Sequence, residues 1–299
     1  MMRYTDLHSS GELRRRAEEL KKYAERCKLC PRECGAMRLK GERGKCGAGD
    51  QIEISGYGPH FGEEPPLVGR GGSGTIFFSF CSLRCVFCQN YETSRGMARY
   101  EVSAEDLAEI MLKLQRKRCV NINLVTPSHF VYQIVESLDI ACSLGLQIPL
   151  VYNCSGYEKV EILSKLEGIV DIYLPDIKYA DPELAKKYSG IDDYPRIAKA
   201  ALKEMHRQVG DLVLNEEGVA ERGLLIRHLV MPGGIAGTAE LMEFIAREIS
   251  PSSWINIMDQ YYPTYLAYRY PELSRRITRE EYREAVEAAK RASPEFHLL

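Results

Sequence analysis

From Thr75 to Met258 the sequence alternates between apolar runs of strand length and amphipathic stretches of helix length. Such alternation favours parallel βα units, and right-handed crossovers would curl these units into a barrel-like sheet. We count six units, whereas a complete barrel has eight. The sequence therefore predicts an α/β fold, an incomplete six-stranded (βα)6 TIM-like barrel that is open on one side. The six expected strands are Thr75–Phe80, Val120–Val125, Ile148–Tyr152, Asp171–Leu174, Gly223–Val230 and Ser253–Met258.

Two helices are expected outside this alternation, each opened by a capping box, in which a Ser or Thr and a Glu three residues later satisfy each other's backbone N–H groups. The first spans Ser9–Cys27, with Ser9 and Glu12 as its box, and the last spans Thr278–Ala292. A short hairpin is expected at Asp211–Gly223. Residues 1–50 are predicted to form an N-terminal appendage, a helix followed by a loop-rich segment with four cysteines. Residues 51–299 are predicted to form the partial barrel with its C-terminal helix.

The composition narrows the class of protein. A formal net charge of −2 gives no reason to expect nucleic acid or an anionic membrane as a partner. The chain shows no leader-like start and no apolar run long enough to cross a bilayer, so a cytoplasmic protein is expected. In a reducing compartment its ten cysteines are more plausible as metal ligands than as disulfides.

Three cysteines, Cys81, Cys85 and Cys88, follow the first expected strand with the spacing C-x3-C-x2-C. A zinc site usually has four ligands in C-x2-4-C pairs, which this triad does not provide. The triad suits a four-iron cluster in which three irons are held by thiolates and the fourth is left open for catalysis. The alternative, a disulfide or a chance group of cysteines, does not account for the motif and its context together.

This motif resembles the signature of the radical S-adenosylmethionine (SAM) superfamily. The chain is most similar to the uncharacterised relatives of pyruvate formate-lyase activating enzyme that carry a cysteine-rich N-terminus, over residues 60 to about 262. The resemblance implies a [4Fe-4S] cluster whose open iron is chelated by SAM, and reductive cleavage of SAM to a 5′-deoxyadenosyl radical that abstracts hydrogen from a substrate. A glycyl-radical protein is the candidate substrate. A flavodoxin- or ferredoxin-like electron donor and an anaerobic setting are implied as well.

Residues at the carboxyl ends of the later strands are candidates for binding SAM, because these ends meet at one edge of a parallel sheet. Asp176 and Lys178 resemble the Asp-Leu-Lys element of the activating enzymes. Arg227 lies inside an apolar run, where an unpaired charge would be costly, and its planar fork suits a carboxylate. The resemblance assigns Arg227 to SAM, and Met258 and Gln260 to the adenine or ribose.

Two strand ends depart from the pattern of the family. Thr126 and Ser128 stand where the family often has Gly-Gly-Glu, so one of them, or the backbone, would contact the SAM amino group. Asn153 takes the place of a charged contact. His129 is either a proton donor or a residue that merely starts a helix. The segment from His60 to Pro66 is a candidate cover for the active site.

A second group of thiols, Cys27, Cys30, Cys34 and Cys46, has the spacing C-x2-C-x3-C-x11-C. Four thiolates complete a tetrahedral set, and zinc would fold a loop that lacks a core. The rival is a second [4Fe-4S] cluster that supplies electrons, because thiolates suit both metals. Zinc is slightly favoured.

Two further hypotheses stay open from the sequence. The substrate of the radical could be a small molecule or an RNA base in place of a protein. A non-catalytic iron–sulfur electron carrier would have no affinity for SAM and would not need Asp176, Lys178 or Arg227.

Overall fold

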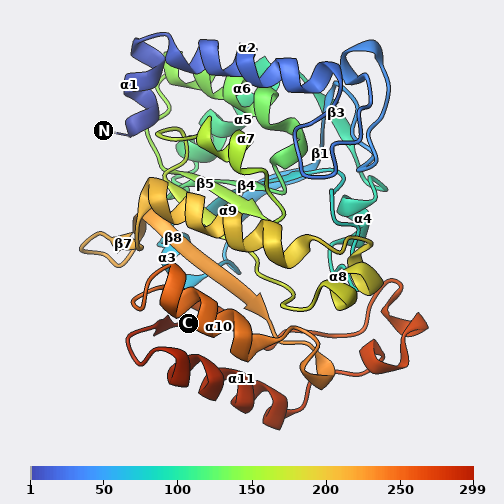
Figure 1. Ribbon diagram of the computed structural model, residues 1–299. Coiled ribbons are helices and arrows are strands. Elements are labelled where there is room, and N and C mark those ends of the chain that lie inside the picture. Colours follow the sequence, from blue (N-terminus) through green and yellow to red (C-terminus); the bar gives the residue numbers. More distant parts are fainter. Residues whose placement is uncertain (1) are drawn as a thin grey trace.

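The computed structural model describes residues 2–299 and has a mostly parallel sheet at its centre (Figure 1). The strand order is β10-β9-β8-β6-β5-β4-β2-β1-β3, and β7 pairs with β8. The strands are β1 (Ile52–His60), β2 (Ser73–Phe78), β3 (Tyr100–Val102), β4 (Ile122–Val125), β5 (Leu150–Cys154), β6 (Ile172–Pro175), β7 (Val213–Leu214), β8 (Ala220–Leu229), β9 (Trp254–Met258) and β10 (His297–Leu298).

The six expected strands are β2, β4, β5, β6, β8 and β9, which lie next to one another and run parallel. The predicted count of six is too low for the whole sheet. An antiparallel pair, β1 and β3, extends one edge, and β10 extends the other edge beside β9. The α/β class with a parallel centre is therefore confirmed. The expected hairpin is formed by β7 and β8.

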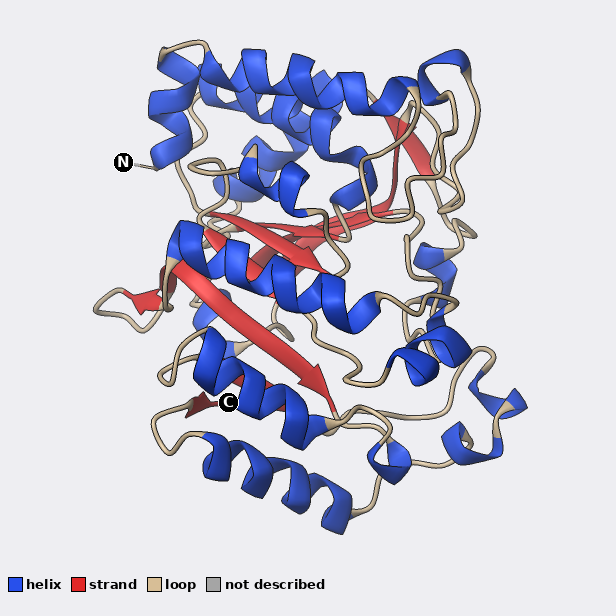
Figure 2. Cartoon of the chain, in the orientation of Figure 1, coloured by secondary structure: helices blue, strands red, loops and turns tan. Residues whose placement is uncertain are grey.

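Helices pack along the sheet, with α2 beside α6 and α10 beside α11 (Figures 1 and 2). The longer helices include α5, α6, α9 and α10, which connect successive parallel strands. The α-helices are α1 (Arg3–Ser9), α2 (Glu12–Glu25), α3 (Pro65–Val68), α4 (Tyr91–Ser94), α5 (Ala104–Arg116), α6 (Val131–Ser143), α7 (Val160–Ser164), α8 (Pro182–Ser189), α9 (Tyr194–Val209), α10 (Thr238–Glu248) and α11 (Arg279–Ala292).

The expected capping box at Thr278 is confirmed at the start of α11, but the box at Ser9 is wrong. The predicted helix Ser9–Cys27 corresponds to α2, which begins later, at Glu12, and α1 before it was not predicted. Gly11 separates the two helices, and its φ of 76° lies in the left-handed region that glycine adopts readily. The Ser9 hydroxyl donates back to the Thr5 carbonyl oxygen within α1, so it cannot cap the helix that begins at Glu12.

The N-terminal fifty residues pack closely on the rest of the chain. Leu13 and Leu20 of α2 are fully buried and belong to the same apolar core as Phe130 and Leu138 of the βα region. Burial of this apolar stripe is what holds a short amphipathic helix in place. The domain boundary near residue 50 stays a prediction.

Gly156→Ala should destabilise the protein more than Gly190→Ala does. Both glycines have positive φ, at 75° and 68°, so each alanine costs roughly 1–2 kcal/mol of backbone strain. A Cβ at Gly156 would also lie 2.3 Å from the Asp176 carbonyl oxygen, whereas nothing lies within 4 Å of one at Gly190. We expect an additional loss on the order of 1–3 kcal/mol at Gly156, measured by urea unfolding. Equal losses in the two variants would contradict the close approach.

Candidate active site

The three thiols of the C-x3-C-x2-C motif lie on the loop that follows β2. Cys85 is buried, Cys81 and Cys88 are half-buried, and all three are free. The loop is held in a strained conformation, since Phe80 and Arg84 have positive φ values of 77° and 62°. Such strain persists only where the surroundings determine the backbone, and it is common at functional sites.

Side chains from the carboxyl ends of five strands meet Cys85 and Cys88 around one cavity. Thr126 follows β4, Asn153 belongs to β5, and Asp176 follows β6. Most of the residues expected from the sequence are therefore brought together. The predicted residues that line the cavity are Cys85, Cys88, Thr126, Asn153, Asp176, Lys178, Arg227, Met258 and Gln260.

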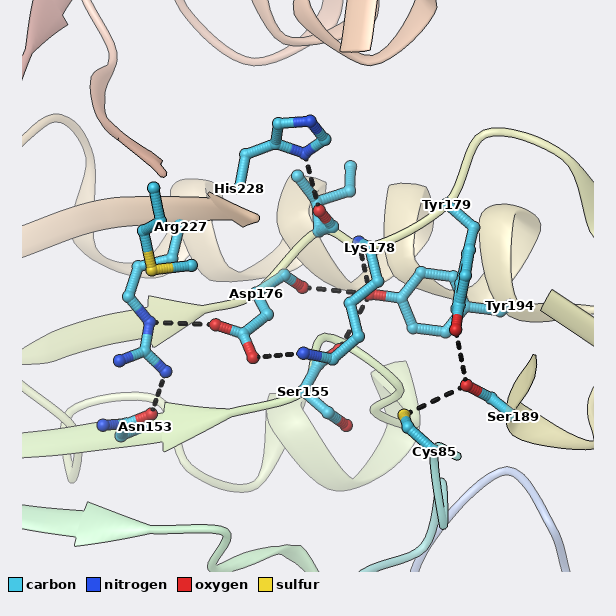
Figure 3. Close-up of polar contacts among 12 residues, drawn as sticks. Cys85, Asn153, Ser155, Asp176, Lys178, Tyr179, Ser189, Tyr194, Arg227 and His228 are labelled. Carbon is cyan, nitrogen blue, oxygen red and sulfur yellow. Dashed lines mark hydrogen bonds and ion pairs between the residues drawn. The ribbon is translucent and has the colours of Figure 1, made fainter. Parts of the chain in front are cut away.

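A buried network of charges forms the wall of this cavity (Figure 3). The Asp176 carboxylate accepts from Arg227 Nε at 2.9 Å and from Lys178 Nζ at 2.5 Å. Arg227 Nη2 also donates to Asn153 Oδ1 at 2.7 Å. The prediction that Arg227 must be paired is thus confirmed, with Asp176 and Asn153 as partners.

The pKa shifts in this network favour the charged forms of Asp176, Lys178 and Arg227. Burial alone would raise the pKa of Asp176, but the Arg227 and Lys178 charges hold it below its usual value. Burial acts against the Lys178 charge, yet Asp176 and then Cys85 keep the pKa of Lys178 above its usual value. The ammonium group of Lys178 therefore faces both a carboxylate and a thiol of the triad.

Hydroxyl groups connect the thiol loop to the neighbouring elements (Figure 3). Ser189 Oγ donates to Cys85 Sγ at 3.0 Å, and it accepts from the Tyr179 hydroxyl at 2.9 Å. The Tyr194 hydroxyl accepts from the Lys178 backbone N–H at 3.0 Å, and its own hydrogen faces the Ser155 carbonyl at 2.9 Å. These residues were not predicted, because nothing in their local sequence distinguishes them from other core tyrosines and serines.

Three predicted positions, Cys81, Ser128 and His129, are not among the residues that line the cavity. Ser128 is buried and donates to the Glu158 carboxylate. His129 is the second residue of a short 3-10 turn that leads into α6, and its ring contacts the Ser79 carbonyl oxygen at 2.7 Å. Burial lowers the pKa of His129 to about 3, so the ring is neutral. Its position favours the helix-start interpretation over that of a proton donor.

The segment expected to cover the active site lies elsewhere, at the amino-terminal ends of the strands. Together with Val219, which directly precedes β8, it lines a separate hollow. From there, Glu63 and Glu64 reach inward until their carboxylates lie 3.9 Å from the Arg227 guanidinium. Glu64 also accepts from Asn256 of β9 at 3.0 Å. No sequence pattern predicts this contact, because two acidic residues before two prolines are typical of an exposed loop.

A third unpredicted carboxyl group, Glu158, is fully enclosed behind the cavity. It accepts from Ser128 and from the Tyr152 hydroxyl, the latter at 3.3 Å. Burial raises the pKa of Glu158 to about 7. Burial likewise raises the pKa of Glu63 to about 7, where Arg227 acts against the shift and Glu64 adds to it.

Comparisons with known proteins agree with the motif. Residues 75–215 match the family model described as the radical SAM superfamily. The uncharacterized protein MJ0674 of Methanocaldococcus jannaschii is 32% identical over 289 residues, which is 92% of this chain and 78% of that protein. The chain belongs to the radical SAM superfamily.

A solved structure shows the same radical SAM fold. It is a radical SAM methyltransferase from Sphaerobacter thermophilus, with a TM-score of 0.52 and 15% identical residues. The match covers 76% of this chain and 66% of that chain, just under two thirds of its length. At this identity the likeness concerns the fold alone. Superfamily membership itself implies an enzyme that uses a [4Fe-4S] cluster and SAM.

The residues present fit the radical SAM cofactors by their donor chemistry. No three His, Cys, Asp or Glu side chains among residues 2–299 are arranged to hold a single metal ion. A cluster does not require its ligands to surround one point, because each thiolate binds its own iron at a separate corner. Cys81, Cys85 and Cys88 are free thiols. Burial raises the pKa of the Cys81 and Cys85 thiols, and the nearby Lys178 ammonium acts against this shift. In the same part of the chain, no helix is long and apolar enough to cross a membrane.

Glu63→Gln should make the stability of the radical SAM protein less dependent on pH. Folding raises the pKa of Glu63 from 4.5 to about 7, so the folded chain keeps a proton that the unfolded chain has lost in this range. The resulting stabilisation is full below pH 4.5 and is lost as the pH rises through 7; for this shift it amounts to roughly 3 kcal/mol at most. Urea unfolding at several pH values measures it.

The control for this series is Glu109→Gln, since Glu109 is exposed on α5. It should leave the pH dependence as it is in the wild type. Glu158 contributes a similar pH dependence to the unfolding free energy of all three proteins. The comparison is therefore between the slopes of unfolding free energy against pH. Parallel curves for the wild type and Glu63→Gln would show that Glu63 is not held as a neutral acid.

Proposed function

We propose that this protein is a radical enzyme that reductively cleaves SAM and abstracts a hydrogen atom from its substrate. The observation that carries the proposal is the single cavity that the Cys85 and Cys88 thiols share with the Asp176, Lys178 and Arg227 charges. When bound, the cluster would supply the electron that breaks a C–S bond of the SAM sulfonium and so yields a 5′-deoxyadenosyl radical. The chain itself would supply binding, orientation and exclusion of water.

Arg227 is the residue best prepared to receive the SAM carboxylate. Its guanidinium is fixed by Asp176 and Asn153 and is buried against the carboxylates of Glu63 and Glu64. A guanidinium held in this way loses little conformational freedom when it binds a carboxylate. Lys178 would offset the negative charge of thiolates at the cluster site, because its ammonium already interacts with the Cys85 thiol.

Aromatic side chains would keep water from the reacting atoms. Phe77, Phe80 and Phe87 line the cavity around the two thiols. Phe87 also contacts the rings of Tyr179 and Tyr261, with centroids 6.3 and 6.2 Å away. A dry site strengthens each electrostatic interaction within it and limits the loss of a reactive radical to solvent.

We also infer that the six parallel strands curve into a partial barrel. Residues at the ends of β2 and β9, which are separated by four strands in the sheet, line the same cavity. Strands that far apart in a flat sheet could not face one another across a cavity of side-chain dimensions, since neighbours lie about 4.8 Å apart.

The substrate is not identified by the relatives. A glycyl-radical protein, as the sequence predicts, gains no support from them, because one is uncharacterized and the other is a methyltransferase with only the fold in common. A small molecule or an RNA base gains none either. A flavodoxin- or ferredoxin-like donor remains our proposal for the source of the electron.

The central test is formation of 5′-deoxyadenosine by anaerobically reconstituted protein with SAM and dithionite. We expect product from the wild type and none from Cys85→Ala, which lacks a cluster ligand. Arg227→Lys should keep its cluster but bind SAM about 10–100-fold more weakly, because a lysine cannot reproduce the paired hydrogen bonds to a carboxylate. Arg247→Lys on the exposed face of α10 is the matched control and should behave like the wild type.

The same experiment separates the proposal from its rival. Wild-type protein that holds four irons but makes no 5′-deoxyadenosine would be an electron carrier. Product formation by Cys85→Ala would show that the ligand assignment is wrong.

A further inference from the structure

The four N-terminal cysteines lie outside the matched family segment, which begins at residue 75. Two of them occur in the same tripeptide, Cys-Gly-Ala, at Cys34 and at Cys46. The glycine that follows each of these cysteines has positive φ, at 70° and 106°. The chain therefore makes the same tight turn after both, and Ala48 N–H donates to Cys46 Sγ at 3.4 Å.

This turn is part of a pattern shared by all four cysteines. In each case the backbone N–H two residues further on faces the thiol, as Leu29 does for Cys27 and Arg32 for Cys30. Four thiols in the same backbone setting, all on one loop, indicate a common ligand.

The thiols are also close to one another. The Cys27 and Cys34 thiols are near enough to interact with each other. Cys34 Sγ and Cys46 Sγ lie 3.3 and 3.4 Å from the position that a Cβ of Gly44 would occupy, so only glycine leaves both sulfurs room. Zinc–sulfur bonds of about 2.3 Å bring four thiolates nearly into contact, whereas a four-iron cube must fit between them. Since no three ligands among residues 2–299 surround one point, binding requires the side chains to turn inward.

A buried positive charge, that of Arg38, lies near these thiols without a negatively charged partner among the described residues. Arg38 is fully buried and donates to the carbonyl oxygens of Gly49 and His129, with no carboxylate paired to it in the described chain. Its guanidinium faces the Cys27 and Cys46 thiols. A buried charge without a counter-charge is costly. One zinc ion with four thiolates carries net negative charge and would supply the compensation that neutral thiols do not.

The residues next to these cysteines hold the loop of the catalytic thiols. Arg32 donates to the Ser82 carbonyl oxygen, and to those of Leu83 and Ser189 at 3.1 and 3.3 Å. From the other side, Arg84 donates to the Lys45 carbonyl oxygen at 3.3 Å. The strained loop between Cys81 and Cys85 is thus fixed through contacts with Arg32, two residues after Cys30, and with Lys45, directly before Cys46.

We propose that Cys27, Cys30, Cys34 and Cys46 bind one structural zinc ion, which holds Arg32 and Lys45 against the loop that binds the catalytic cluster. The second part rests on the proposed function, because it assumes that Cys81, Cys85 and Cys88 bind a cluster. The zinc site itself does not depend on it.

Zinc and iron per chain, measured by mass spectrometry on anaerobically purified full-length protein, test both parts. We expect one zinc and four irons in the wild type, and no zinc in Cys34→Ser. Arg32→Gln should keep the zinc but lose the contacts to the thiol loop, so that it retains its iron about tenfold less well against a chelator. Cys142→Ser changes a free cysteine of α6 outside both sets and should match the wild type.

The outcomes that overturn the proposal are distinct. Iron in place of zinc at the four cysteines, or no metal there, sinks the zinc site. Full iron retention in Arg32→Gln sinks the bracing role. If Cys34→Ser does not fold, titration of metal-stripped wild type with Co²⁺ decides, because tetrahedral thiolate coordination has its own absorption bands and their absence counts against the site. Failure to cleave SAM would refute the proposed function and leave the zinc content untouched.

Discussion

The arrangement of the site depends on a buried carboxylate that lies between two buried cations. Asp176 cannot lie in this interior without Arg227 and Lys178, and neither cation could lie there without it. The sheet fixes their meeting point, because Asp176 and Arg227 face each other as a bridge just beyond the paired segment of β6 and β8. The cavity beside them is polar because apolar side chains that filled it would lie against these buried charges without compensating them.

The central strands were predictable because apolar residues predominate in each of them, as is usual for strands in the middle of a parallel sheet. The edge strands were not. β1 contains Gly56, Gly58 and Pro59, which are poor strand formers, and β3 and β10 have only three and two residues. These strands are formed by pairing with a neighbour rather than by their own sequence. The break between α1 and α2 depended on a single left-handed glycine, which a helical pattern conceals.

The site was predictable to the extent that it lies where parallel strands end. Asp176, Lys178 and Arg227 come together as the topology requires, and their mutual pairing follows from their burial. Glu63 and Glu64 could not be found in this way, because they enter from a connection at the opposite end of the strands. Ser128 illustrates the reverse case, since it lies in the expected segment but bonds to Glu158 instead of facing the cavity.

The reach of Arg32 has a consequence for how the chain assembles during synthesis. Its guanidinium joins carbonyl groups that lie up to 157 residues further along the sequence. At 5–20 residues per second a ribosome needs about 8–30 s to make that length. For this interval the first cysteines to emerge are without their docking partners and open to oxidation or to a wrong metal. The four-cysteine segment is thus made well before the elements that it contacts and is among the last to reach its native contacts.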